Sequence, residues 1–109
     1  MIEALVSGKV YKQPQARLDQ RGHTFALGKV KAATSTGETL FISCIVFGEA
    51  AERFLKLNDG DAVALAGSIT PKTWTDGQGQ AHAALDMQVQ QVLSVYQARA
   101  KRTGGKQDE

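Results

Sequence analysis

Only one segment of this 109-residue chain has the apolar spacing of an α-helix, and the other patterned segments are typical of β-strands. In residues 49–57, apolar side chains recur about every third or fourth position. The segment ends at Asn58-Asp59-Gly60, which is typical of a helix C-terminus. A chain of this length forms one domain. The sequence therefore predicts a single all-β domain with one short helix.

Five segments around this helix have the composition of strands. They are rich in β-branched, aromatic or alternating apolar residues, and glycine, proline or short polar runs separate them. This order is the layout of the OB-fold, a five-stranded Greek-key barrel, here with its helix between strands 3 and 4 and spanning residues 1–96. The predicted strands are residues 4–11, 24–33, 40–47, 61–70 and 83–96.

Turn and breaker residues refine this pattern. Pro14 and the polar residues 15–22 predict a loop or a frayed edge, and residues 34–37 predict a compact turn. Asp76-Gly77 predicts a hairpin between the last two strands. A bend or bulge is expected at Gly8, a bend at Gly67, and an edge position or bulge at Pro71. The alternation of the last strand shifts once near Gln90-Gln91.

Charge is distributed unevenly along the chain. Residues 1–31 hold six basic and two acidic residues, a net +4, and residues 32–96 hold three and seven, a net −4. Residues 97–109 hold four and two, a net +2, in a polar segment expected to be a flexible basic tail. A local basic region favours binding of a polyanion, although lysines also keep strand edges solvated. The predicted phosphate contacts are Lys9, Lys12, Arg17, Lys29 and Lys31.

The strand at residues 40–47 has two distinct faces. Alternation places Leu40, Ile42, Cys44 and Val46 on one side, and this aliphatic and cysteine set is suited to the barrel interior. Phe41 and Phe47 then lie on the outer side, about 20 Å apart along the strand. Exposed aromatic rings on a sheet can stack the bases of a single strand. Coverage of both rings by the helix or by a subunit partner is the alternative.

Trp74 is the second aromatic candidate. It lies beside the predicted hairpin turn, between Thr73 and Thr75, which is an unusual setting for a core tryptophan. Lys72 shares its strand face and is suited to neutralise a phosphate beside a base stacked on the indole. The alternative is that Trp74 closes one end of the barrel as a lid.

Signals for catalysis, metals, cofactors and membranes are weak. His23 and His82 are isolated, and neither belongs to a catalytic or metal-ligand spacing. Cys44 is the single cysteine, which excludes an internal disulfide and a cysteine metal cluster. No apolar run reaches the roughly 18 residues that a membrane span needs. We expect a cytoplasmic, non-enzymatic protein without a cofactor or a metal.

Several motifs resemble those of the bacterial single-stranded DNA-binding proteins. Residues 45–48, Ile-Val-Phe-Gly, precede Phe54-Leu55 and residues 58–61, as the family's strand, helix and turn do. The most specific part is the Lys-x-Trp-Thr-Asp-x-x-Gly-Gln run at residues 72–80. Early in the chain, Gly8, Pro14 and Arg17 fall at a glycine, a proline and an arginine of the family. The resemblance covers residues 4–96.

The resemblance implies an OB-fold that binds single-stranded DNA in replication, recombination or repair. It places Phe41 at a stacking tryptophan of the family, Phe47 at a stacking phenylalanine and Trp74 at another stacking tryptophan. Lys72 falls at a basic position of the same strand. These are the aromatic residues that the alternation of faces also selects.

Departures from the family pattern suggest a second interpretation. Residues 34–38 form a very short loop where the family usually has a long DNA-wrapping arm. Glu49 and Thr70 stand where a lysine and an arginine are common, and residues 103–109 lack the acidic, phenylalanine-terminated tip that recruits repair and replication enzymes. These features resemble a short sibling group, primosomal replication protein B, a typically dimeric adaptor that bridges the restart helicase and a helicase loader on single-stranded DNA.

The aromatic residues are compatible with two more functions. An adaptor could use them for protein contacts, and base stacking does not distinguish DNA from RNA. A single barrel has a short binding surface and exposed strand edges, so we expect a homo-oligomer, either a dimer or a tetramer. The expected partners are single-stranded DNA and replication or restart proteins, with no membrane contact.

Overall fold

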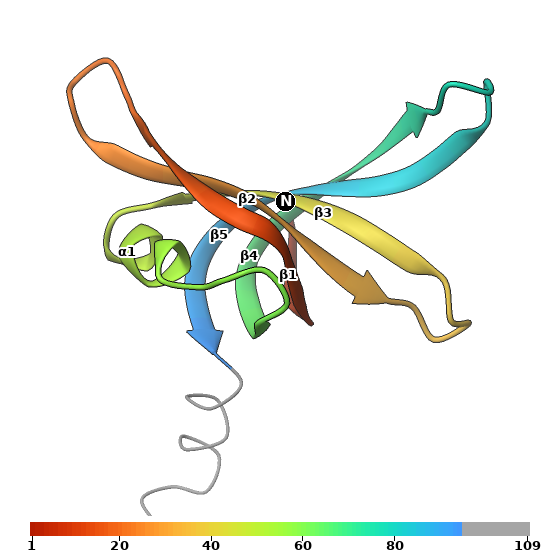
Figure 1. The fold of residues 1–109 in the computed structure, drawn as a ribbon, viewed down its shortest axis with the longest axis horizontal. Helices are drawn as coiled ribbons and strands as arrows, with labels where there is room; N and C mark the ends of the chain where they lie inside the picture. The colour runs from red at the N-terminus through yellow and green to blue at the C-terminus, as the bar shows by residue number, and fades with distance from the viewer. Residues whose placement is uncertain (95–109) are drawn as a thin grey trace, which may run out of the picture.

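The computed structural model describes residues 1–94, which form a five-stranded closed barrel (Figure 1). The strand order around the barrel is β1-β2-β3-β5-β4, and the single helix lies between β3 and β4 in the chain. This arrangement confirms the predicted OB-fold. The elements are β1 (Ile2–Leu18), β2 (Thr24–Ala33), β3 (Thr39–Phe47), α1 (Glu49–Leu55), β4 (Ala62–Thr75) and β5 (Ala81–Ser94).

Close strand approaches at two glycines shape the barrel. A Cβ atom on Gly8 would fall on the carbonyl of Lys31, and one on Gly67 would fall on the carbonyl of Gln88. The β4–β5 register also skips one residue, because Ala66 pairs with Gln91 whereas Gly67 pairs with Val89. The predicted bend at Gly67 and the predicted shift in alternation at Gln90-Gln91 are therefore one feature, a β-bulge that bends this pair of strands.

The prediction of a loop or a frayed edge over residues 15–22 was wrong for residues 15–18. Residues 15–18 continue β1 and pair with residues 24–27 of β2. A bulge between Tyr11 and Gln15 absorbs Pro14, which is buried, and Lys12 takes a left-handed backbone conformation with φ of 65°. The Lys12 amide donates a hydrogen bond of 2.5 Å to the Asp59 carboxylate. The sequence-based prediction ended the strand at Tyr11, before the proline, whereas the bulge lets the strand continue beyond Pro14.

The β4–β5 hairpin is longer than predicted and extends away from the barrel (upper right in Figure 1). The pairing of β1 with β4 ends at Ile2 and Ile69, so beyond that point β4 pairs with β5 alone. Pro71 therefore lies at an edge, as predicted. The expected turn at Asp76-Gly77 forms the tip, and the expected end of the last strand, residues 95 and 96, lies outside the described residues, as does the tail.

The core confirms the predicted faces of β3 and includes one face of α1. Ile42, Cys44 and Val46 are buried, and Phe54 of α1 is fully buried. A Cβ atom at Gly28 would lie 2.6 Å from the Phe54 ring, so the missing side chain at Gly28 leaves room for it. The core residues are Val10, Ala26, Val30, Ile42, Cys44, Val46, Ala50, Ala51, Phe54, Leu57, Val63, Leu65, Met87, Val89 and Val92.

The buried thiol of Cys44 is expected to be inert in the native protein. Burial raises its pKa to about 12, and the thiolate is the reactive form. The native protein should not react with Ellman's reagent at neutral pH. In guanidinium chloride its one cysteine should react and release one equivalent of the coloured product. Rapid labelling of the native protein would contradict the burial of this side chain.

Candidate nucleic-acid interface

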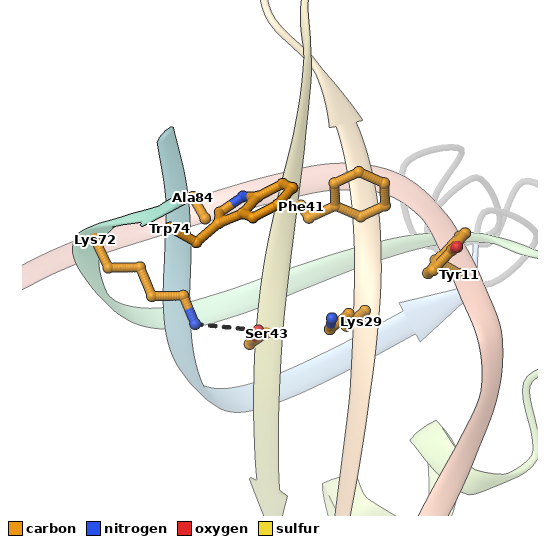
Figure 2. A pocket seen from close by; sticks show the side chains of 7 residues that line it. All are labelled: Tyr11, Lys29, Phe41, Ser43, Lys72, Trp74 and Ala84. Atoms are coloured by element: carbon orange, nitrogen blue, oxygen red, sulfur yellow. Dashed lines mark hydrogen bonds between the residues drawn. The ribbon is translucent and has the colours of Figure 1, made fainter. Parts of the chain in front are cut away.

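All five strands contribute side chains to one groove on the outer face of the barrel (Figure 2). The groove has a volume of about 370 Å³ and is open to solvent. We call this cavity the aromatic groove. It is lined by Tyr11 of β1, Lys29 of β2, Phe41 and Ser43 of β3, Lys72 and Trp74 of β4, and Ala84 of β5.

Strand register explains why residues so distant in the sequence meet here. Tyr11 pairs with Lys29, which pairs with Ser43, so their side chains share one face of three adjacent strands. On the other side of the groove, Lys72 pairs with Ala84. Residues directly opposite each other on paired strands point to the same side of a sheet. The outward-facing residues of one strand therefore lie beside the outward-facing residues of the next strand.

Phe41 occupies the middle of the groove. Its ring and that of Tyr11 pack in an edge-to-face arrangement, with centroids 5.0 Å apart and an interplanar angle of 71°. Figure 2 shows Phe41 between Tyr11 and Trp74. Tyr11 was predicted to lie on a strand but not to belong to the site. The usable signal was its alternation with Lys9, which places Tyr11 on the basic outer face.

Trp74 is 43% exposed and stacks on His82, with ring centroids 4.5 Å apart and an interplanar angle of 22°. The His82 Nε2 atom lies 2.8 Å from a carboxylate oxygen of Asp76. This hydrogen bond, together with backbone hydrogen bonds from Gln80 and Gln78, lowers the pKa of the Asp76 carboxyl below its ordinary value. His82 was expected to be a solvated or hydrogen-bonded strand residue, and its hydrogen bond to Asp76 agrees with this, but its stacking on Trp74 was not predicted.

Phe47 lies outside the aromatic groove. It is 46% exposed at the end of β3, and its ring packs on Phe25 at a centroid distance of 5.4 Å. Arg17 pairs with Phe25, which pairs with Phe47, so the three side chains form a row across β1, β2 and β3. The predicted aromatic set is therefore divided between two places, and Phe25 is a second residue that sequence analysis missed.

The predicted basic residues also differ in position. Lys29 and Lys72 line the aromatic groove, and the Lys12 and Lys31 ammonium groups lie 5.3 Å and 5.4 Å from the centre of the Tyr11 ring. Lys9 lines a separate hollow that it shares with Lys31, and Arg17 belongs to the Phe25–Phe47 row.

Lys72 is not a free cation in this structure. Its Nζ atom lies 2.5 Å from a carboxylate oxygen of Asp86 and donates a hydrogen bond of 3.4 Å to the Ser43 hydroxyl (dashed in Figure 2). Both members of the ion pair are substantially exposed, so water screens their attraction. An anion placed here would have to displace Asp86 from the ammonium group.

Two structural observations concern metals and membranes in the described part of the chain. Within residues 1–94, no group of three or more His, Cys, Asp or Glu side chains is arranged to hold a metal ion. The helix in this part of the chain, α1, is too short and too polar to cross a membrane.

An OB-fold barrel with aromatic and basic side chains in one surface groove belongs to the class of nucleic-acid-binding barrels. Residues 1–95 match the Single-strand binding protein family, and the chain belongs to that family. A comparison with curated proteins gives no match. Among solved structures, the chain is similar to the small single-stranded DNA-binding protein from Streptomyces coelicolor, with a TM-score of 0.71 and 19% identity over 90% of this chain and 96% of that one. At this identity, the similarity supports the fold.

Family membership confirms the predicted resemblance and the prediction of single-stranded DNA binding. The alternative of a primosomal restart adaptor is not favoured. The family is a non-catalytic DNA-binding family whose members typically oligomerise and take part in replication and repair. The individual DNA-contacting residues stay a prediction.

Proposed function

We propose that the aromatic groove binds single-stranded DNA without sequence preference. Bases stack on Trp74, Phe41 and Tyr11, and phosphates pair with Lys29 and Lys72. The observation that carries this proposal is the convergence of three aromatic and two basic side chains, from four strands, in one open groove. Stacking is worth about 1–3 kcal/mol per base and is tolerant of sequence, because every base has a flat face.

The row formed by Arg17, Phe25 and Phe47 extends the proposed path beyond the groove. Phe47 is exposed, and along β3 it lies six residues from Phe41, about 20 Å at the rise of a strand. Lys31 and Lys12 flank Tyr11 and add positive charge beside the groove. We propose that Lys9, Lys12, Arg17 and Lys31 contact phosphates of a DNA strand that is longer than the groove itself.

We also propose that the protein binds DNA without catalysing a reaction on it. We further propose that it assembles as a homo-oligomer. The first part of β1, through Gly8, pairs with β4 alone, because its pairing with β2 begins at Lys9. Ile2 and Leu5 are 53% and 78% exposed on this part of the strand. An unpaired edge with exposed apolar residues favours association with a second copy. We propose that residues 1–96 are the DNA-binding domain.

Fluorescence titration with thymidine oligomers of increasing length tests the proposed function. Trp74 is the single tryptophan, so its emission should be quenched in a saturable way as oligo-dT is added. The logarithm of the binding constant should fall linearly with the logarithm of the salt concentration, by about 0.7 for each phosphate contact. Competition with matched RNA oligomers measures the preference for DNA. Emission that stays constant during the titration would contradict binding at the aromatic groove.

Replacement of Asp86 by asparagine is expected to tighten binding of oligo-dT by about two- to fivefold. The change frees Lys72 and removes a carboxylate from the path of the phosphates, so the salt dependence should also steepen by about 0.7. Both are measured by repeating the titration at several salt concentrations.

Glu52→Gln is the matched control for Asp86→Asn, because it makes the same change in net charge at an exposed position on α1. It should leave both the affinity and the salt dependence near their original values. Equal tightening by both variants would mean that net charge, and not the Lys72–Asp86 pair, controls binding.

A further inference from the structure

The contact between Trp74 and His82 belongs to a unit that the turn of the β4–β5 hairpin builds. The two residues are direct cross-strand partners, so both side chains stand on the same face of the hairpin. Their rings are close to parallel, at 22°, with centroids 4.5 Å apart. Among residues 1–94, His82 is the one ring that stacks on this indole.

Asp76 anchors the imidazole of His82. One carboxylate oxygen of Asp76 lies 2.8 Å from Nε2 of His82. The other accepts hydrogen bonds of 2.9 Å from the backbone amides of Gln78 and Gln80. The turn therefore holds the carboxylate, the carboxylate holds the imidazole, and the imidazole lies on the indole.

This chain of contacts has a consequence for Trp74. An indole ring has two faces on which another ring can stack, and His82 covers one of them. Trp74 stands on the part of β4 that pairs only with β5, and its side chain is 43% exposed. A ring held in its binding orientation loses less conformational entropy when a base stacks on it.

We propose that His82 is a positioning residue of the aromatic groove. Anchored by Asp76, it covers one face of Trp74 and holds the other face available for a single base. This inference rests on the proposed function of the groove. Lys29, Lys72 and Asp86 are the charged side chains that line or border the groove, and Lys72 and Asp86 pair with each other and not with His82.

A measurement on the free protein tests the contact itself. The imidazole restrains the indole, so the emission anisotropy of Trp74 should fall when His82 is replaced by alanine, and His82→Phe should restore it. His23→Ala is the matched control, because His23 also lies near a carboxylate, 3.6 Å from Asp19, but stacks on no tryptophan. An unchanged anisotropy in His82→Ala would overturn the proposal.

Binding measurements test the positioning role. With fluorescein-labelled oligo-dT, His82→Ala should bind about two- to tenfold more weakly than the original protein. His82→Phe, which restores a flat ring, should recover most of that loss. In the absence of the indole there is nothing to position, so the double variant Trp74→Ala/His82→Ala should bind no more weakly than Trp74→Ala.

Two outcomes separate the failure of this inference from failure of the proposed function. If Trp74→Ala weakens binding but His82→Ala binds like the original protein, the positioning role is wrong and the groove stands. If neither variant changes the affinity, the groove is not the binding site and both proposals fall.

Discussion

Replacing Trp74 with alanine is expected to weaken the binding of oligo-dT by about 5- to 150-fold. This range follows from a loss of about 1–3 kcal/mol for one stacked base, with a tenfold change in affinity for each 1.4 kcal/mol. Trp74 is exposed and lines the aromatic groove, so its removal should affect binding far more than folding. Because the substitution removes the one tryptophan, the affinity must be measured by the anisotropy of a labelled oligonucleotide.

Two further variants control the Trp74 experiment. Trp74→Phe keeps an aromatic face and should retain most of the affinity. Leu18→Ala removes an apolar side chain that is 70% exposed but does not line the groove, and it should bind like the original protein. If Trp74→Ala binds as tightly as Leu18→Ala, the indole does not stack a base.

Replacing Phe54 with alanine is expected to lower the free energy of unfolding by about 3–5 kcal/mol. The ring is fully buried, and it fills the space above Gly28 between α1 and β2. Its removal leaves a cavity that the closed barrel has little freedom to fill. The loss is a large fraction of the roughly 5–15 kcal/mol that stabilises most domains. Urea unfolding followed by circular dichroism measures it.

Phe47→Ala is the matched control for this stability measurement. It makes the same chemical change at a ring that is 46% exposed, so it should cost about 1 kcal/mol or less. It is also expected to weaken the binding of long oligonucleotides, if Phe47 lies on the DNA path. Similar losses of stability in the two variants would contradict the placement of Phe54 in the core and Phe47 on the surface.

The fold was predictable because its signals are local. The alternation in β3 identified Ile42, Cys44 and Val46 as core residues, since a strand places successive side chains on opposite faces. The helix between β3 and β4 was recognisable by its spacing, although it ends at Leu55 and not at residue 57. Local rules were least successful where a bulge let β1 continue past Pro14.

The candidate site was predictable only in part. Phe41, Trp74, Lys72 and Lys29 were chosen for their chemistry, and the structure brings them into one groove. Phe47 met the same criteria but lies elsewhere. No family motif pointed to the ring of Tyr11 that completes the groove.

The sequence by itself determined the class of fold and the side chains able to stack bases, because strand periodicity and side-chain chemistry are properties of short segments. Only the tertiary structure decided which of those side chains meet. The Lys72–Asp86 ion pair, the His82–Trp74 stack and the Tyr11–Phe41 contact all join different strands. Such pairs depend on register, and the bulges and the closure of the barrel that set the register arise from packing of the whole chain.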